Sequence, residues 1–239
     1  KYYDKLEDFI ARVAKKAQVG GKTINENQEN NSFYLYYKLN HLYKHVSLPL
    51  SLPTKLLVKI GKIAMPKPKK NNKIKNKDIV VVTSSSLAKV YFNKKKEKVN
   101  LDYIEKNYPG TVKAIANHPG VGFVVVRQGQ NLQVISKKGK VIISPKKITI
   151  QGENFLSRYG DVERLAKQMR IHMKMKYAGD IVVNGAFDGK TIIAFGSYHY
   201  GAHNGIGGEQ HDAFFVSKEK YDFSKEINAR VLHDLFKQY

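Results

Sequence analysis

Ile79-Val80-Val81-Val82 begins the segment that indicates the fold class most clearly, and the chain continues as Thr83-Ser84-Ser85-Ser86-Leu87-Ala88-Lys89-Val90-Tyr91-Phe92. Four consecutive apolar residues of this kind are typical of a strand that is buried on both faces of a sheet. Residues 123–127, 132–136 and 141–144 are similar apolar segments, and glycine-containing turns separate them. The segments are therefore predicted to be strands of one sheet.

Helices are predicted between and around these strands. Asn100 is suited to cap a helix that runs to about residue 116, and Asp161 one that runs to about residue 176. Residues 3–16 carry apolar positions at helical spacing, and we expect Gly20-Gly21 to end that helix. Ser224 is suited to cap a last helix. Strands that alternate with helices predict an α/β protein, with a mixed sheet and helices on its faces.

The chain divides into two parts by composition. Residues 1–77 contain the first helix, an aromatic segment at 33–45 that fits either a helix or a strand, and a Pro/Lys-rich linker at 67–77. Residues 78–239 form the α/β region. Residues 55–65 are basic and amphipathic, which fits either an anionic membrane surface or a surface helix packed on the main body.

The charge of the chain is strongly positive. Its 239 residues carry a formal net charge of +22 at pH 7. Such a balance predicts attraction to nucleic acid, an anionic membrane surface or an acidic partner, and a lysine-rich genome is the alternative explanation. The chain has no cysteine, so any metal ion must be held by histidine and carboxylate groups. No apolar run reaches 18 residues, which predicts a soluble or peripheral protein without a transmembrane segment.

One glycine-rich segment stands out as a candidate site. It reads Gly201-Ala202-His203-Asn204-Gly205-Ile206-Gly207-Gly208-Glu209-Gln210. Glycine lets the backbone approach a ligand closely, and a neutral imidazole is a preferred ligand of zinc-type ions. The alternative is a tight turn with a solvent-exposed histidine.

Several blocks resemble the C-terminal part of the alkaline phosphatase superfamily, in particular its nucleotide pyrophosphatase/phosphodiesterase-like members. The resemblance covers most of residues 78–217. It rests on the order of four blocks: Ser84-Ser85-Ser86-Leu87-Ala88 with the strand before it, residues 117–126, residues 179–185, and the segment around His203 followed by residues 213–216. The resemblance implies an α/β/α fold and a metal-dependent phosphoester hydrolase in which His203 holds one divalent ion, zinc or manganese.

The resemblance also implies that an essential portion is missing. Family members place a metal-binding aspartate, a Thr or Ser nucleophile and an Asp-His-Gly ligand pair upstream of the matched region, and this chain has no Asp-His-Gly. The chain is therefore expected to act as the C-terminal portion of such an enzyme. An N-terminal catalytic portion or subunit would supply the nucleophile and the remaining ligands, and the phosphoester substrate and metal would bind only in the assembled enzyme.

Five other polar residues are weaker candidates for site residues. His199 and His211 could support the metal ligand from nearby, but surface roles are the default for both. His118 is expected to order the turn at Pro119-Gly120, and Asp180 and Asp188 to serve in caps and Asx turns. The competing hypothesis for the whole chain is a non-catalytic basic protein, or an accessory subunit, that contacts nucleic acid, anionic lipid or an acidic partner.

Overall fold

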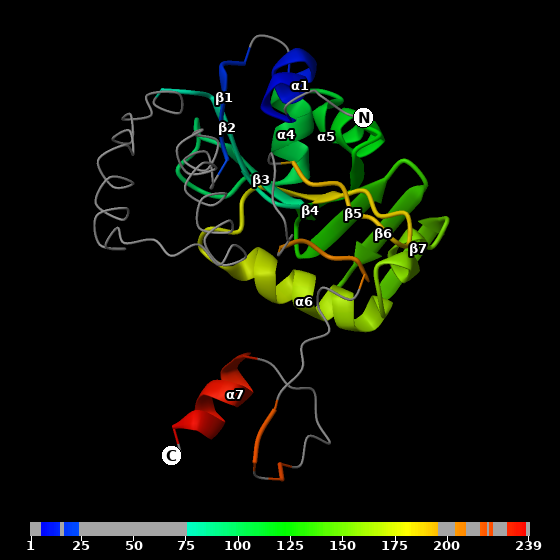
Figure 1. The fold of residues 1–239 in the computed structure, drawn as a ribbon. Coiled ribbons are helices and arrows are strands. Elements are labelled where there is room, and N and C mark those ends of the chain that lie inside the picture. Colours follow the sequence, from blue (N-terminus) through cyan, green and yellow to red (C-terminus); the bar gives the residue numbers. More distant parts are fainter. Residues whose placement is uncertain are drawn as a thin grey trace, which may run out of the picture.

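The fold is built around one mixed eight-stranded sheet with helices on both faces (Figure 1). This computed structural model describes residues 6–14, 17–23, 76–195, 204–208, 216–218, 220–221 and 229–237. The spatial order of the strands is β1-β2-β3-β8-β4-β5-β6-β7. Their bounds are β1 Val19–Thr23, β2 Ile79–Ser84, β3 Leu87–Phe92, β4 Val121–Gln128, β5 Asn131–Ser136, β6 Gly139–Ile143, β7 Ile148–Gly152 and β8 Ile181–Gly185. The predicted α/β class with a mixed sheet is confirmed.

The pairing within this sheet is almost entirely antiparallel. Only β1 and β2 run parallel, with Val19 opposite Ile79. The strands from β4 to β7 form a meander of consecutive antiparallel pairs. Strand β8 comes last in the chain but lies between β3 and β4, with Asn184 opposite both Leu87 and Phe123. The centre of the sheet is thus completed by its last strand.

Three helices cover one face of the sheet: α1 (Leu6–Val13), α4 (Leu101–Asn107) and α5 (Thr111–Asn117). They lie together on the upper side of the sheet in Figure 1. Ile10, Ile104 and Ile115 are completely buried there, in one cluster with Val81 and Val183 of the sheet. Burying an aliphatic side chain of this size stabilises a fold by about 1.5–3 kcal/mol.

Helix α6 (Val162–Lys174) covers the opposite face, preceded by the 3-10 helix η3 (Phe155–Arg158). Its buried positions Leu165, Met169 and Met173 follow the helical repeat and pack in a second cluster with Phe123 and Val125 of β4. Asp161 caps the helix as predicted, because its Oδ1 accepts a hydrogen bond from the Arg164 N–H at 2.8 Å.

The single helix predicted for residues 100–116 is wrong in extent. Asn100 does cap it, with Oδ1 accepting the Tyr103 N–H at 3.0 Å, but α4 ends at Asn107. Pro109 has no N–H to continue the helix, and Gly110 has a left-handed φ of +74°. Helix α5 therefore starts anew at Thr111.

The prediction that Gly20-Gly21 ends the first helix is also wrong. Both residues lie inside β1, where they pair with Val80 and Val81. Helix α1 already ends at Val13, and β1 begins at Val19. Through α1 and β1, part of the N-terminal segment belongs to the same core and sheet as the rest.

The other strand predictions are mostly confirmed. Residues 79–81 are buried as expected, whereas Val82 is half-exposed. Residues 123–127, 132–136 and 141–143 lie in β4, β5 and β6. After β8 the chain turns back in a short hairpin with one bridge, between Phe187 and Ile192. Strands β1, β3 and β7 were not predicted.

Some predictions fall outside the described residues. These are the aromatic segment 33–45, the basic segment 55–65, most of the linker 67–77 and the cap at Ser224. Helix α7 is described from Ala229 to Phe236. Among the described residues, no helix is long and apolar enough to cross a membrane.

Candidate functional site

One end of the sheet gathers the groups that could bind a ligand. Because neighbouring strands run antiparallel, the last residues of β2, β5 and β8 lie at the same end as the first residues of β3, β4 and β6. The register places Ser84 opposite Leu87, Val121 opposite Gly185, and Ser136 opposite Gly139. We call this the active end; one cavity lies among its loops, and a second lies between α6 and the sheet with part of its lining at this end.

A polar junction at the active end fixes the segment 204–208. The side chain of Asn184 accepts the Ile206 N–H at 2.7 Å and donates to the Ile206 carbonyl at 2.9 Å. The Asn204 amide donates to Ser84 Oγ at 2.8 Å, and Ser86 Oγ donates to the Asn204 carbonyl. Two stretches about 120 residues apart in the chain are thereby joined side by side.

The backbone at this junction is strained. Ser85 has a φ of +52° and Asn204 a φ of +117°, both in the region that favours glycine. Ser85 Oγ is buried, and no hydrogen-bond partner for it exists within the described residues. Strained residues cluster at ligand-binding sites, because the surrounding structure must hold them there.

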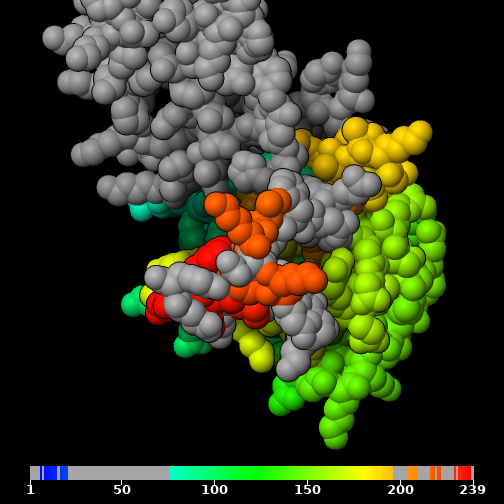
Figure 2. Space-filling view, turned by 60° about the horizontal axis from the view of Figure 1, so that its bottom comes forward, coloured from blue at the N-terminus to red at the C-terminus, as the bar shows by residue number. Residues whose placement is uncertain are grey.

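The first cavity at the active end has cations at its edge, and we call it the basic cavity. Its volume is about 460 Å³. Lys137, Lys138 and Arg158 line it together with an apolar wall that includes Phe187 and Ile193. In Figure 2 the hairpin after β8 (gold) lies against the light-green surface of the β5-to-α6 region, where these parts of the chain meet.

The cations of the basic cavity are exposed and only partly neutralised. Lys138 Nζ contacts Glu153 Oε1 at 2.9 Å, and this hydrogen bond and charge lower the pKa of Glu153. Within the described residues, Lys137 and Arg158 have no ion pair. The carboxylate of Asp188 also lines the cavity, but it accepts the N–H groups of Lys190 and Thr191 in its own turn.

The wall of the basic cavity depends on Tyr159. Its hydroxyl accepts the Phe187 N–H at 3.2 Å, and burial raises the pKa of this phenol, so it stays neutral. Its ring meets Phe123 edge-on at a centroid distance of 5.0 Å. Gly122 makes the approach feasible, because a Cβ there would lie 2.0 Å from the Tyr159 hydroxyl.

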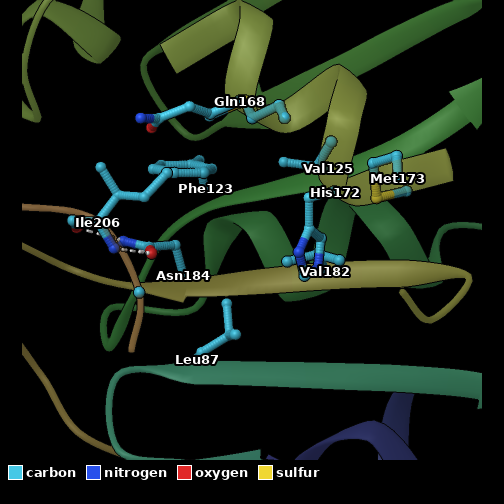
Figure 3. A pocket seen from close by; sticks show the side chains of 11 residues that line it. Leu87, Phe123, Val125, Gln168, His172, Met173, Val182, Asn184 and Ile206 are labelled. Atoms are coloured by element: carbon cyan, nitrogen blue, oxygen red, sulfur yellow. Dashed lines mark hydrogen bonds between the residues drawn. The ribbon is translucent and has the colours of Figure 1, made fainter. Parts of the chain in front are cut away.

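The second cavity lies between α6 and the sheet, and we call it the α6 cavity (Figure 3). Its volume is about 200 Å³. Gly205 and Ile206 of the fixed segment line it, and a Cβ added at Gly207 would lie 3.1 Å from Phe187 and 3.3 Å from Tyr159, which line the basic cavity. The segment 204–208 therefore lines one cavity and passes close to the wall of the other. The lining residues from α6 are Gln168, Met169, His172 and Met173.

Cations elsewhere on the fold have structural partners. Lys98 Nζ donates to the Met175 carbonyl, and Arg127 donates to the carbonyls of Met173 at 3.1 Å and Gly179 at 2.7 Å. Lys89 Nζ donates to the Tyr177 carbonyl at 3.1 Å. These groups satisfy the carbonyls at the C-terminus of α6 and just beyond it, where positive charge also suits the helix dipole.

The predicted metal ligand is not placed by the structure. His203 lies outside the described residues, and so do His199 and His211. Within the part that is described, no group of three His, Cys, Asp or Glu side chains could hold a metal ion. The metal site at His203 stays a prediction.

His118 and Asp188 have the local turn roles expected of them, whereas the cap or Asx turn expected at Asp180 is wrong. His118 Nδ1 accepts the Gly120 N–H at 3.1 Å and so orders the turn at Pro119. Asp188 closes an Asx turn with Thr191. Asp180 is buried and accepts the N–H groups of Phe92 and Val99 at 2.9 Å each.

Sequence reasoning missed the residues that line the two cavities. Lys138 was predicted only as part of a turn with Gly139, and Lys137 and Arg158 were not singled out. His172 was noted only as a position on the buried side of α6. The signal available in the sequence was a pair of basic residues at the end of a strand. The cavity beside this pair also needs Tyr159 and the hairpin after β8, so the pair alone could not reveal it.

Comparison with known proteins gives no relative: no protein-family model, curated protein or solved structure matches this chain. The function must therefore be argued from the cavities and the charge.

Proposed function

We propose that this chain binds nucleic acid through backbone phosphates, with the basic cavity as the main point of contact. The meeting of Lys137, Lys138 and Arg158 at one hollow carries the proposal. Lysine and arginine that neutralise phosphates release counterions, and this term supplies sequence-independent affinity for nucleic acid.

The charge of the folded part supports this proposal. Residues 76–195 contain 21 Lys and Arg against 9 Asp and Glu, a net charge of +12 without the lysine-rich linker. Several cations at the other end of the sheet are bonded to backbone carbonyls around the end of α6, as Lys98 and Arg127 show. Those at the basic cavity are exposed, and Glu153 is the one carboxylate paired with them in the described part.

The test is a fluorescence anisotropy titration with labelled 20-nucleotide single-stranded and duplex DNA. The variant changes Lys137, Lys138 and Arg158 to Ala, and the matched control changes Lys113, Lys146 and Lys147 to Ala. All six residues are exposed, so both variants lose the same charge from the surface.

The proposal expects a selective effect. The cavity variant should bind at least about tenfold more weakly than the control variant at 100 mM salt. Its slope of log affinity against log salt should be shallower by about 2–3, one unit for each lost phosphate contact. Equal weakening in the two variants would show that total charge acts without a defined site, and no binding by the unaltered protein would refute the function.

A second candidate is the C-terminal portion of a metal-dependent phosphoester hydrolase with an alkaline phosphatase-like fold. One contact favours it: the block around Ser84 to Ser86 and the block that follows His203 are hydrogen-bonded to each other at Asn204. The described side chains of this junction are serine and asparagine, which are not preferred zinc ligands. The remaining ligands must therefore come from outside the described residues or from another chain.

The hydrolase candidate is tested by metal content and activity. We would measure zinc and manganese binding by calorimetry, and hydrolysis of bis(p-nitrophenyl) phosphate in the protein as purified with its partners. His203→Ala should abolish both, while the control His233→Ala on α7 should change neither. Metal binding and hydrolysis that survive His203→Ala would exclude this assignment.

A further inference from the structure

The α6 cavity is a separate site of a different chemical character. Its walls come from β3, β4, β8, α6 and the segment 204–208, and most of the lining is apolar: Leu87, Phe123, Val125, Met169, Met173, Val182 and Ile206. In the view of Figure 3, Phe123, Asn184 and Ile206 group at one end of the cavity, and Val125, His172, Met173 and Val182 at the other. None of the lining residues is charged at neutral pH unless His172 is protonated.

The size of this cavity suits a single ring. Its volume is about 200 Å³, and an apolar protein cavity of roughly 150 Å³ is known to bind benzene. The thioethers of Met169 and Met173 line it, and methionine sulfur makes favourable contacts with aromatic rings. A flat aromatic molecule therefore matches both the volume and the lining.

His172 supplies a hydrogen-bonding group that the fold itself does not use. Its Nε2 is buried, and among the described residues it has no hydrogen-bond partner. Burial, together with the nearby charges of Lys89 and Lys98, lowers the pKa of this imidazole. The ring is therefore neutral at pH 7, and Nε2 can either donate or accept, according to the tautomer.

The other polar groups of the cavity are less suited to this role. The amide of Asn184 already bonds Ile206 through both its oxygen and its nitrogen, so it is committed to holding the segment 204–208. The side chain of Gln168 is exposed on α6. A buried polar atom without a partner weakens a fold, and a ligand that supplies the partner gains that energy on binding.

We infer that the α6 cavity binds a small, neutral aromatic molecule whose hydroxyl or ring N–H forms a hydrogen bond with His172 Nε2. An ionised ligand is disfavoured, because the apolar walls cannot replace its hydration. This site is independent of the proposed function: it uses another cavity, no cationic side chain and no phosphate.

Methionine methyl groups give a direct test of this inference. In protein labelled with ¹³C at the methionine methyls, Met169 and Met173 report on the cavity, and Met175, which is 54% exposed, is the internal control. The probes are phenol, which can donate or accept one hydrogen bond, and toluene, which has the same ring without a polar group. Phenol should shift the Met169 and Met173 signals in a saturable way and leave Met175 unchanged.

The role of His172 is tested by comparing the two probes in His172→Leu. The unaltered protein should bind phenol roughly five- to tenfold more tightly than toluene, the effect of one buried hydrogen bond. In the variant this preference should disappear while toluene still binds. DNA binding should be the same in both proteins, so failure here is distinguishable from failure of the proposed function.

Three outcomes would overturn the inference. The first is the absence of saturable shifts at Met169 and Met173 in the unaltered protein, a result that does not depend on any variant folding. The second is an equal response of Met175, which would indicate non-specific contact. The third is a preference for phenol that persists in His172→Leu, which would exclude the proposed hydrogen bond.

Discussion

Asp180 is the residue whose removal should weaken this fold most for its size. It lies just before β8, with only 6% of its surface exposed. Its Oδ2 accepts the Phe92 N–H and its Oδ1 accepts the Val99 N–H, both at 2.9 Å. Arg127 Nη2 approaches Oδ1 at 3.4 Å. One carboxylate thus joins the end of β3, the start of the α4 region and β4.

Asp180→Ala should lower the free energy of unfolding by about 3–5 kcal/mol. Each hydrogen bond to a charged group contributes about 1.5–3 kcal/mol, and the terms are not additive. Removing one partner of a buried ion pair by itself costs about 3–5 kcal/mol, because the other charge stays buried. A domain of ordinary stability has about 5–15 kcal/mol in total, so the loss would be large.

The assay is urea denaturation followed by far-UV circular dichroism, since the chain has no tryptophan. Asp234→Ala removes the same charge from an exposed site on α7 and should change stability by no more than about 0.5 kcal/mol. In a double-mutant cycle, Asp180→Ala combined with Arg127→Met should lower the free energy of unfolding by about 1–3 kcal/mol less than the sum of the two single losses. A loss below about 1 kcal/mol for Asp180→Ala would refute the stabilising role of this carboxylate between β3, the α4 region and β4.

Three further predictions concern local features of the fold. Gly185→Ala should destabilise the protein by about 1–3 kcal/mol in the same assay, because the new Cβ would lie 2.0 Å from the Ile193 carbonyl oxygen. Asn100→Ala should lower the free energy of unfolding by about 1 kcal/mol, because the Tyr103 N–H loses the side-chain oxygen that caps the helix, whereas Asn100→Asp should cost much less. His172 should destabilise the fold as pH falls: its folded-state pKa is lowered, so the unfolded chain takes up the proton first. Urea titrations at pH 7 and pH 5 should therefore show a larger loss for the unaltered protein than for His172→Leu, and equal losses would contradict the burial of this imidazole.

Local signals in the sequence predicted local structure well. The caps at Asn100 and Asp161 act through bonds to residues three positions on, so composition at those positions is enough to find them. Pro109-Gly110 was an equally local signal for a break between helices, and it should have outweighed the continuous apolar spacing. Gly20-Gly21 misled the prediction, because a glycine pair is common at helix ends and its place in β1 depends on a partner strand about 60 residues away.

The cavities could not have been found from the sequence. The basic cavity needs Lys137 and Lys138 from one turn, Arg158 from η3, and the hairpin that follows β8. The α6 cavity needs Asn184 to hold Ile206, so that the segment 204–208 forms its edge. The resemblance to a hydrolase family directed attention to His203, and no feature of the sequence pointed to His172 instead.

Composition and contacts between near neighbours were enough to predict the class of the fold, the positive charge, about half of the strands and the caps at Asn100 and Asp161. The complete fold was needed to establish the order of the strands, above all the insertion of β8 between β3 and β4. It also decided which polar groups meet at the active end. Pairing between distant strands depends on the burial of the whole core, and no short stretch of sequence encodes that.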